Sequence, residues 1–432
     1  MNADDAPTPP TARKRRWRLG LAIGLLILLL LLALAIRQVL QPRNATRLIL
    51  HEASQILGLD ITADGEPELQ WRGTPRWVVR GVSARIPGTS RELLHAERIL
   101  LSVPWSTLKS RGQLLDIERV ELDAPIVNLA VLAEWQKSRP TTTTQRLPTL
   151  SRGLGIVRGQ VLGDGWRVDG LDIDLPRFAP AQPLAMHARG RYAADALQLP
   201  FDLHLALSKP AASAALGLTG ELTPTTGDWK LPMRVRLSAP MRWGDDGLHL
   251  QPATLGANVR YVGDGGEPIA FALGAHGPAR IASDGVGWPS LSIALRADGV
   301  VPNLDAAGNL TAGKQLQLAL HGLIQAWPEA WPALPAPLSD SRSPLPFTLG
   351  YAGALDFSDT FDLGIQRDAT RLDARLRVRE VLAWRDAAAA DSPLPPIEGR
   401  LVTPRLDIAG AQLEGVEVNF EADDAPSSER LP

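Results

Sequence analysis

The chain has 432 residues, of which 45% are hydrophobic and 21% charged, a globular balance that excludes a mostly disordered chain. The 45 Lys and Arg residues against 47 Asp and Glu residues give a net charge of −2, so the basic excess typical of nucleic-acid binding is missing and no nucleic-acid partner is expected. The absence of cysteine excludes disulfide scaffolds, cysteine-ligated zinc and thiol catalysis.

An uncharged run at residues 19–36 follows five basic residues near the N-terminus. At a rise of about 1.5 Å per residue this run covers about 27 Å, enough to cross the core of a bilayer. We therefore predict a short basic cytoplasmic tail at 1–18 and a transmembrane helix at 19–40, with the N-terminus in the cytoplasm by the positive-inside rule. The expected anchor residues are Trp17, Leu19, Leu25, Leu28, Leu31 and Ile36, and the topology-setting residues are Arg13, Lys14, Arg15, Arg16 and Arg18.

A cleaved signal peptide is the alternative interpretation of the same run. Ala33-Leu34-Ala35 satisfies the small-x-small rule for cleavage. The run is longer than the usual apolar region of about 7–15 residues in signal peptides, which favours an anchor. Both interpretations export everything after residue 43.

The spacing of hydrophobic residues along the sequence predicts one helix followed by many strands. Residues 44–57 have helical spacing, and Gly58 supplies a stop. From Leu197 to Leu207 apolar residues occupy every odd position, which predicts a half-buried strand. The same alternation, separated by Gly, Pro, Asn and Asp turns, recurs at 171–175, 231–237, 269–273, 291–295, 316–320, 372–378 and 416–420. About 20 strands would span about 95 Å at about 4.8 Å per strand.

The predicted fold class is mainly β: a transmembrane helix, a short amphipathic helix, and a long, curved antiparallel β-sheet that forms an open apolar groove. We expect a helix and β-region at 44–135, central strands at 150–325, a Trp/Pro-rich loop at 326–346, C-terminal strands at 347–424 and a flexible tail at 425–432. A sheet with one apolar face must keep that face out of water. Either a second sheet covers it, which gives a dry sandwich, or a ligand does. The residues expected to line the groove are Leu199, Phe201, Leu203, Leu205, Leu207, Val235, Leu237, Phe271, Leu273, Ile293, Leu295, Leu318 and Leu320.

The region from 48 to 129 carries a series of motifs behind the predicted anchor. The most specific is I-x-x-V-x-L-x-x-P-x-V-x-L, which runs from Ile117 to Leu129 and describes two consecutive strands with a proline between them. It follows the extended segment 77–86 and the strand 96–103, which continues into Pro104-Trp105. These motifs resemble the N-terminal region of the AsmA family of bacterial envelope proteins, and 399–422 is similar to strand pairs in that family's C-terminal region.

The resemblance implies a relation to the repeating-β-groove lipid-transfer proteins, in which an apolar trough carries acyl chains. We therefore expect a non-enzymatic, single-pass protein of the bacterial inner membrane with most of its chain in the periplasm. It would shield or conduct phospholipid-like acyl chains and contribute to outer-membrane lipid homeostasis, without a cofactor. Its expected partners are lipid, the inner membrane and an outer-membrane or periplasmic protein.

Two other functions are open from the residues alone. A non-catalytic envelope scaffold would bind partners through sheet edges and have a dry β-sandwich core. A periplasmic hydrolase would need a convergent cluster of polar residues, and no nucleophile elbow or Walker A loop occurs in the sequence. No catalytic residue is therefore predicted.

Histidines and aspartates lie on the polar side of the predicted strands. No two of the seven histidines have i, i+2 or i, i+4 spacing, so His204, His249 and His321 are predicted to face solvent and not to ligate metal. Asp172 and Asp174 alternate with apolar residues, as on a solvated strand face, and lack the spacing of a calcium loop. A solvated face is also favoured over a lipid-headgroup site for Arg152, Arg158 and Arg167.

Overall fold

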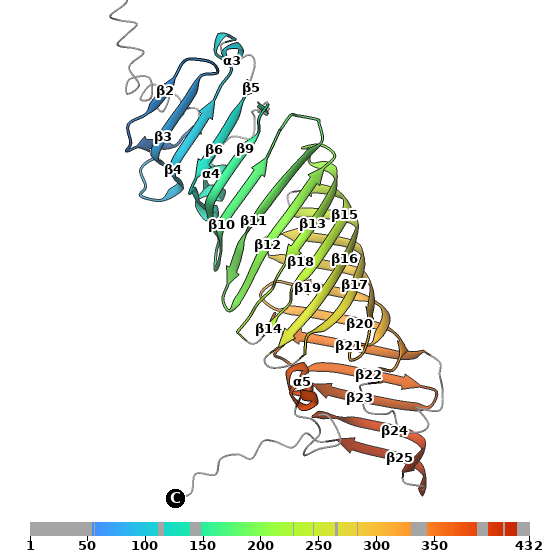
Figure 1. The fold of residues 1–432 in the computed structure, drawn as a ribbon. Helices are drawn as coiled ribbons and strands as arrows, with labels where there is room; N and C mark the ends of the chain where they lie inside the picture. The colour runs from blue at the N-terminus through green and yellow to red at the C-terminus, as the bar shows by residue number, and fades with distance from the viewer. Residues whose placement is uncertain are drawn as a thin grey trace, which may run out of the picture.

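One large β-sheet makes up most of the molecule (Figure 1). The computed structural model describes residues 54–55, 57–110, 116–138, 148–227, 229–244, 246–263, 267–282, 284–329, 344–386, 396–408 and 411–420. These residues include 25 strands, of which 23 belong to the large sheet, and three short helices. The long, mostly antiparallel sheet that the sequence predicted is confirmed.

The strands in the first half of the sequence are of unequal length, and the shortest have two residues. They are β1 (Asp60–Ala63), β2 (Glu68–Gln70), β3 (Arg76–Arg85), β4 (Glu92–Ser102), β5 (Asp116–Ile117), β6 (Arg119–Asp123), β7 (Ile126–Asn128), β8 (Thr149–Leu150), β9 (Leu154–Leu162), β10 (Trp166–Leu175), β11 (Leu184–Ala194) and β12 (Leu197–Leu207).

Beyond β12 most strands have ten residues or more. They are β13 (Ser213–Leu222), β14 (Trp229–Lys230), β15 (Met233–Gly244), β16 (Gly247–Gly263), β17 (Ile269–Ala282), β18 (Gly285–Ala297), β19 (Asn303–Ala312), β20 (Leu316–Ala326), β21 (Leu345–Gly353), β22 (Phe361–Arg367), β23 (Thr370–Leu376), β24 (Ile397–Ile408) and β25 (Ala411–Phe420).

Strand order in the large sheet follows the chain almost throughout. From β9 to β25 each strand pairs antiparallel with the next, except that β13 pairs directly with β15 while the short β14 lies beside β16. At the other end β9 lies parallel to β6 and β7, which pair with β4, and β3 joins β4 to β1 and β2. The two strands β5 and β8 form a separate parallel pair.

The sheet is twisted along its length. In Figure 1 the strands from β3 to β12 run steeply across the view, whereas those from β20 to β25 lie nearly horizontal. This rotation is the accumulated twist between neighbouring strands, which arises from the handedness of L-amino acids. The apolar face of the sheet therefore follows a twisted path.

The end of the first helix and the start of the sheet agree with the sequence. Residues 54, 55 and 57 are helical, and the Leu59 N–H donates to the Ser54 carbonyl at 3.1 Å. Gly58 has a φ of 60°, which glycine adopts without a Cβ clash. It therefore supplies the left-handed residue with which helices commonly end. The earlier part of the predicted helix 44–57 lies outside the described residues.

Three helices were not expected from the sequence. α4 (Leu129–Lys137) follows β7 directly, and its residue Val131 packs with Leu59, Ala84 and Leu93 in a buried cluster over the first strands. α5 (Val378–Asp386) follows β23, so the strand predicted at 372–378 ends at Leu376 instead. A third helix, α3 (Trp105–Lys109), forms one turn after β4.

Among the described residues no helix has both the length and the apolar character needed to cross a membrane. The predicted tail 1–18, the transmembrane helix 19–40 and the tail 425–432, with all the anchor and topology-setting residues, lie outside the described residues. Of the predicted loop 326–346, residues 330–343 also lie outside them, and β20 and β21 flank the gap.

Candidate functional site

Apolar side chains align across neighbouring strands on one face of the large sheet. Leu205 on β12 lies opposite Leu218 on β13, which lies opposite Leu237 on β15. This row reaches both ends of the sheet when the β10–β11 register is continued by one position beyond the pair Asp174–His187. It runs through Leu69, Trp77, Leu101, Val120, Leu154, Leu175, Met186, Leu205, Leu218, Leu237, Leu255, Ala275, Ile293, Ala306, Gly322, Phe347, Ile365, Leu372, Leu401 and Val418.

We call this set the apolar row. None of its members is polar, and each is buried or half-buried. At about 4.8 Å between strands, the row extends for roughly 90 Å from β2 to β25. The apolar face is therefore one continuous surface along the whole sheet.

The thirteen residues predicted to line a groove all lie on the face of the apolar row. Leu203, Val235 and Leu273 belong to a parallel row, because Val235 lies opposite Gly220 and Ala257, and Leu273 opposite Ala257. Val235 and Leu320 are only 4% and 8% exposed, and the other eleven are half-buried. Their role in lining a lipid groove stays a prediction.

The opposite face is polar and carries ion pairs between neighbouring strands. We call it the polar face. Because most of these pairs are exposed, each stabilises the fold by no more than about 1 kcal/mol, so their main effect is to keep this face charged and hydrated. Examples are Arg189–Asp172 at 2.8 Å, Arg234–Glu221 at 3.0 Å, Arg296–Asp305 at 2.6 Å, Arg375–Asp362 at 3.2 Å and Arg400–Glu417 at 2.6 Å.

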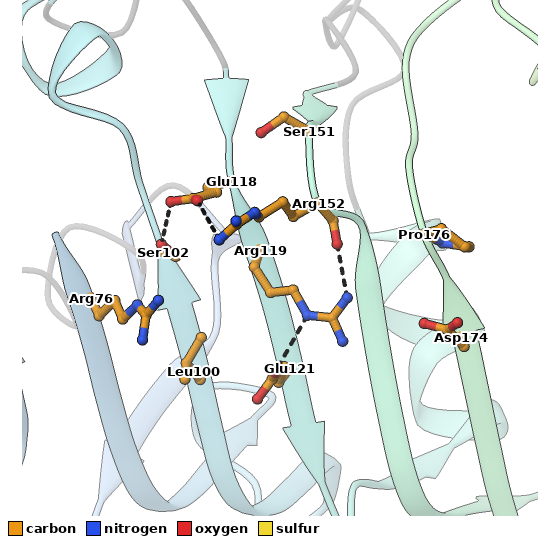
Figure 2. A pocket seen from close by; sticks show the side chains of 10 residues that line it. All are labelled: Arg76, Leu100, Ser102, Glu118, Arg119, Glu121, Ser151, Arg152, Asp174 and Pro176. Carbon is orange, nitrogen blue, oxygen red and sulfur yellow. Dashed lines mark hydrogen bonds and ion pairs between the residues drawn. The ribbon is translucent and has the colours of Figure 1, made fainter. Parts of the chain in front are cut away.

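An open depression of about 600 Å³ lies at the N-terminal end of the sheet, where Arg76, Arg119 and Arg152 face Glu118 and Glu121 (Figure 2). Arg152 contacts Glu118 at 3.0 Å, and Arg119 contacts Glu121 at 3.1 Å. Hydrogen bonds from Thr74 and Ser102, together with the nearby arginines, lower the pKa of Glu118 from its ordinary value. Both glutamates of this site are therefore paired with an arginine.

The three clustered arginines of the sequence are exposed and paired with different acids, in agreement with the predicted solvated face. Arg152 is paired with Glu118, Arg158 binds both Glu97 and Asp123 at 2.8 Å, and Arg167 binds Asp169 at 2.7 Å. The alternating aspartates are likewise strand residues of β10. Asp172 lies opposite Arg189, and Asp174 lies opposite His187, both on β11.

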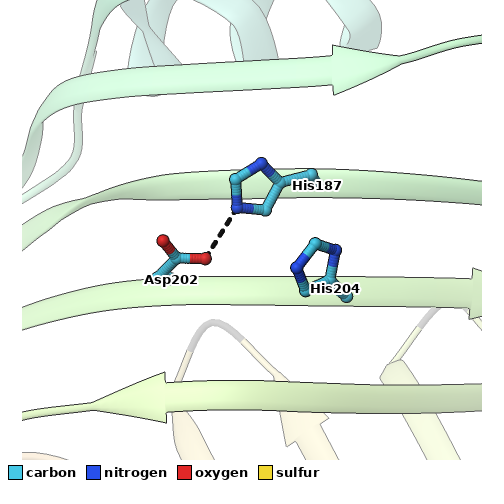
Figure 3. Close-up of side chains that lie close together, drawn as sticks. All are labelled: His187, Asp202 and His204. Atoms are coloured by element: carbon cyan, nitrogen blue, oxygen red, sulfur yellow. Dashed lines mark hydrogen bonds and ion pairs between the residues drawn. The ribbon is translucent and has the colours of Figure 1, made fainter.

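Two histidines that are far apart in the sequence lie side by side in the structure. His187 on β11 and His204 on β12 lie opposite each other, and their rings stack with centroids 4.4 Å apart (Figure 3). The His187 Nε2 donates to Asp202 Oδ1 at 2.6 Å. The turn at Asp195-Ala196 pairs Ala194 with Leu197, so counting back equally along both strands from this turn would have found the pair.

A scan against protein-family models and searches of curated proteins and of solved structures find no match to this chain. The fold therefore defines only a broad class of protein, one built on a long and mostly antiparallel β-sheet of 23 strands with one apolar face. The resemblance to the AsmA family stays a prediction from the motifs in the sequence.

Proposed function

We propose that this protein binds lipid acyl chains along the apolar face of its sheet and shields or conducts them, with the anchor at 19–40 holding it in a bacterial inner membrane. The sheet would lie in the periplasm and serve the lipid balance of the envelope. The single observation that carries the proposal is the apolar row, which crosses twenty strands of the large sheet, from β2 to β25, without a polar residue.

A continuous apolar surface suits a chain of methylene groups. Burying one CH₂ group stabilises it by about 0.8 kcal/mol, and an acyl chain that moves along a uniform surface exchanges one such contact for another. No step along the row then requires the whole chain to enter water. The charged headgroup can stay hydrated outside the face, because only the acyl part gains from burial.

Exposed aromatic residues at the N-terminal end of the sheet support placing this end near a membrane. Trp71 and Trp105 stack with ring centroids 5.9 Å apart and are 40% and 43% exposed. Leu108 on α3 is 46% exposed nearby in the sequence. Tryptophan is enriched at membrane interfaces because its ring is apolar and its N–H is polar. This end also follows the predicted anchor in the chain.

Site-specific photo-crosslinking of the full chain in cells tests the proposal. The photoreactive residue benzoylphenylalanine would replace Leu205, a half-buried member of the apolar row, in cells whose phospholipids carry a radioactive phosphate label. The matched control places it at Ala206, the next residue, which is exposed on the polar face. We expect labelled lipid on the protein at position 205 and little at 206.

Two outcomes would contradict the proposal. Equal labelling at both positions would mean that lipid contacts the protein without regard to its faces. Protein adducts at position 205 without lipid would mean that the apolar face meets another protein and not acyl chains.

A further inference from the structure

Two imidazoles and a carboxylate from one hairpin meet on the polar face (Figure 3). His187 and Asp202 share a hydrogen bond, and His204 stacks on His187 from the opposing strand. One potential ligand atom from each of the three lies within 4.8 Å of the other two. We propose that His187, Asp202 and His204 bind one late first-row divalent cation of the zinc class.

The donor set fits such a cation and not a hard one. Imidazole nitrogen is a ligand for Zn²⁺, Cu²⁺ and Ni²⁺, whereas Ca²⁺ and Mg²⁺ prefer sites made of oxygen atoms only. Two nitrogens and one carboxylate oxygen would fill three positions of a tetrahedral site and leave the fourth to water or an outside ligand.

Binding requires small movements of the side chains only. The two rings stack at an interplanar angle of 16°, so they must rotate apart before both can direct a nitrogen at one ion. The side chains of His187 and Asp202 are 36% and 55% exposed, which leaves room for this rotation. The cation would then take the place of the proton that His187 and Asp202 share.

The backbone beneath the cluster is a regular hairpin. The β11–β12 register is unbroken from Leu184–Leu207 to Ala194–Leu197, so the three Cα positions are fixed by strand pairing. Arg189, the cross-strand neighbour of Asp202, binds Asp172 at 2.8 Å. This ion pair directs the guanidinium toward β10 and leaves the Asp202 carboxylate to His187.

The metal site is independent of the proposed lipid binding, because its residues lie on the face opposite the apolar row. Leu203 and Leu205 alternate with Asp202 and His204 along β12 and point to the other side of the sheet. A protein that fails to bind lipid can bind the cation, and the reverse also holds. A negative result in the lipid crosslinking test therefore leaves the metal proposal intact, and a negative result in the metal test leaves the lipid proposal intact.

The test uses the untagged full chain in detergent, stripped of metal with a chelator. Titration with Zn²⁺ by calorimetry should show one ion per chain, and Co²⁺ should give the intense visible absorption of a tetrahedral site. Both His204→Ala and the nearly isosteric Asp202→Asn should weaken zinc binding about tenfold or more. Circular dichroism would confirm that each variant keeps its β-structure.

His249→Ala is the matched control. His249 on β16 also contacts an aspartate, with its Nε2 2.8 Å from Oδ1 of Asp246 in the preceding turn, but the described residues place no second histidine in that pair's cluster. This variant should bind zinc as the unmodified chain does. The proposal is overturned by an unmodified chain that takes up no zinc, or by equal affinity of the His204→Ala and His249→Ala variants.

Discussion

Individual carboxylates on the polar face are held in their charged form by neighbouring strands. Asp172 on β10 accepts a hydrogen bond from the Arg158 backbone N–H at 2.8 Å and pairs with Arg189 on β11 at 2.8 Å. The backbone hydrogen bond and the nearby guanidinium lower the pKa of Asp172 below its ordinary value. A carboxyl with a lowered pKa stabilises the folded protein while it is ionised.

We predict that Asp172→Asn lowers the free energy of unfolding by about 1–2 kcal/mol near neutral pH. The contribution is complete above the ordinary aspartate pKa of about 3.9 and is lost as pH falls through the lowered pKa of the folded protein. The two proteins should therefore converge in stability in acid. Urea unfolding at a series of pH values measures the difference.

Asp174→Asn, two residues further along the same face of β10, is the control and should change stability less. A difference between Asp172→Asn and the unmodified chain that grows as the pH falls would contradict the assigned role of Asp172.

Single residues also show what alternation along one strand can and cannot predict. It placed His204 on the solvated face correctly, because side chains of a strand alternate between faces. It did not place His187 beside His204, because that contact depends on the register between two strands. Register is set by the turn and by pairing across the hairpin, and neither is visible in spacing along one strand.

Among the elements, long strands were predictable and short helices were not. Strands such as β12, with alternating exposure over eleven residues, give a clear period of two. α4 has nine residues and follows a strand motif without a break, so its sequence shows only about two and a half turns of a helical pattern. Its start is fixed by a cap, since Asn128 Oδ1 accepts hydrogen bonds from the N–H groups of Ala130 and Val131.

Removing this cap should destabilise α4 and the strands beneath it. We predict that Asn128→Ala costs about 1 kcal/mol in the free energy of unfolding, because two N–H groups at the helix start lose their acceptor. Asn128→Asp keeps an oxygen at the same position and should retain most of the stability. Chemical unfolding compares the three proteins, and equal losses in the two variants would contradict the assigned role of the Asn128 oxygen as the cap.

Over the whole molecule, the proposed lipid binding would depend on the twenty strands of the apolar row together. A single charge on the row should therefore interrupt a path that no single residue creates. Leu237 on β15 lies within the row, and the next residue, Ser238, lies on the opposite face. A substitution to Asp can therefore be made on the apolar face, at Leu237, and on the polar face of the same strand, at Ser238.

If lipid enters from the N-terminal end, Leu237→Asp should leave photo-crosslinking to lipid at position 205 intact and reduce it strongly at position 372, on β23. The charge would have to be desolvated by a passing acyl chain, which costs several kcal/mol. Ser238→Asp should leave both positions unchanged. Undiminished crosslinking at 372 in the Leu237→Asp protein would argue against transport along the row.

Pairing between successive strands also determines how the molecule can be built and resized. Beyond β9 each strand finds its partner close by in the sequence, so a newly made segment can join the existing sheet edge without waiting for distant parts of the chain. Each added hairpin lengthens the sheet by about 10 Å and disturbs only the edge that it joins. The span of the protein is thus set by counting hairpins, and a longer or shorter version needs no redesign of the rest.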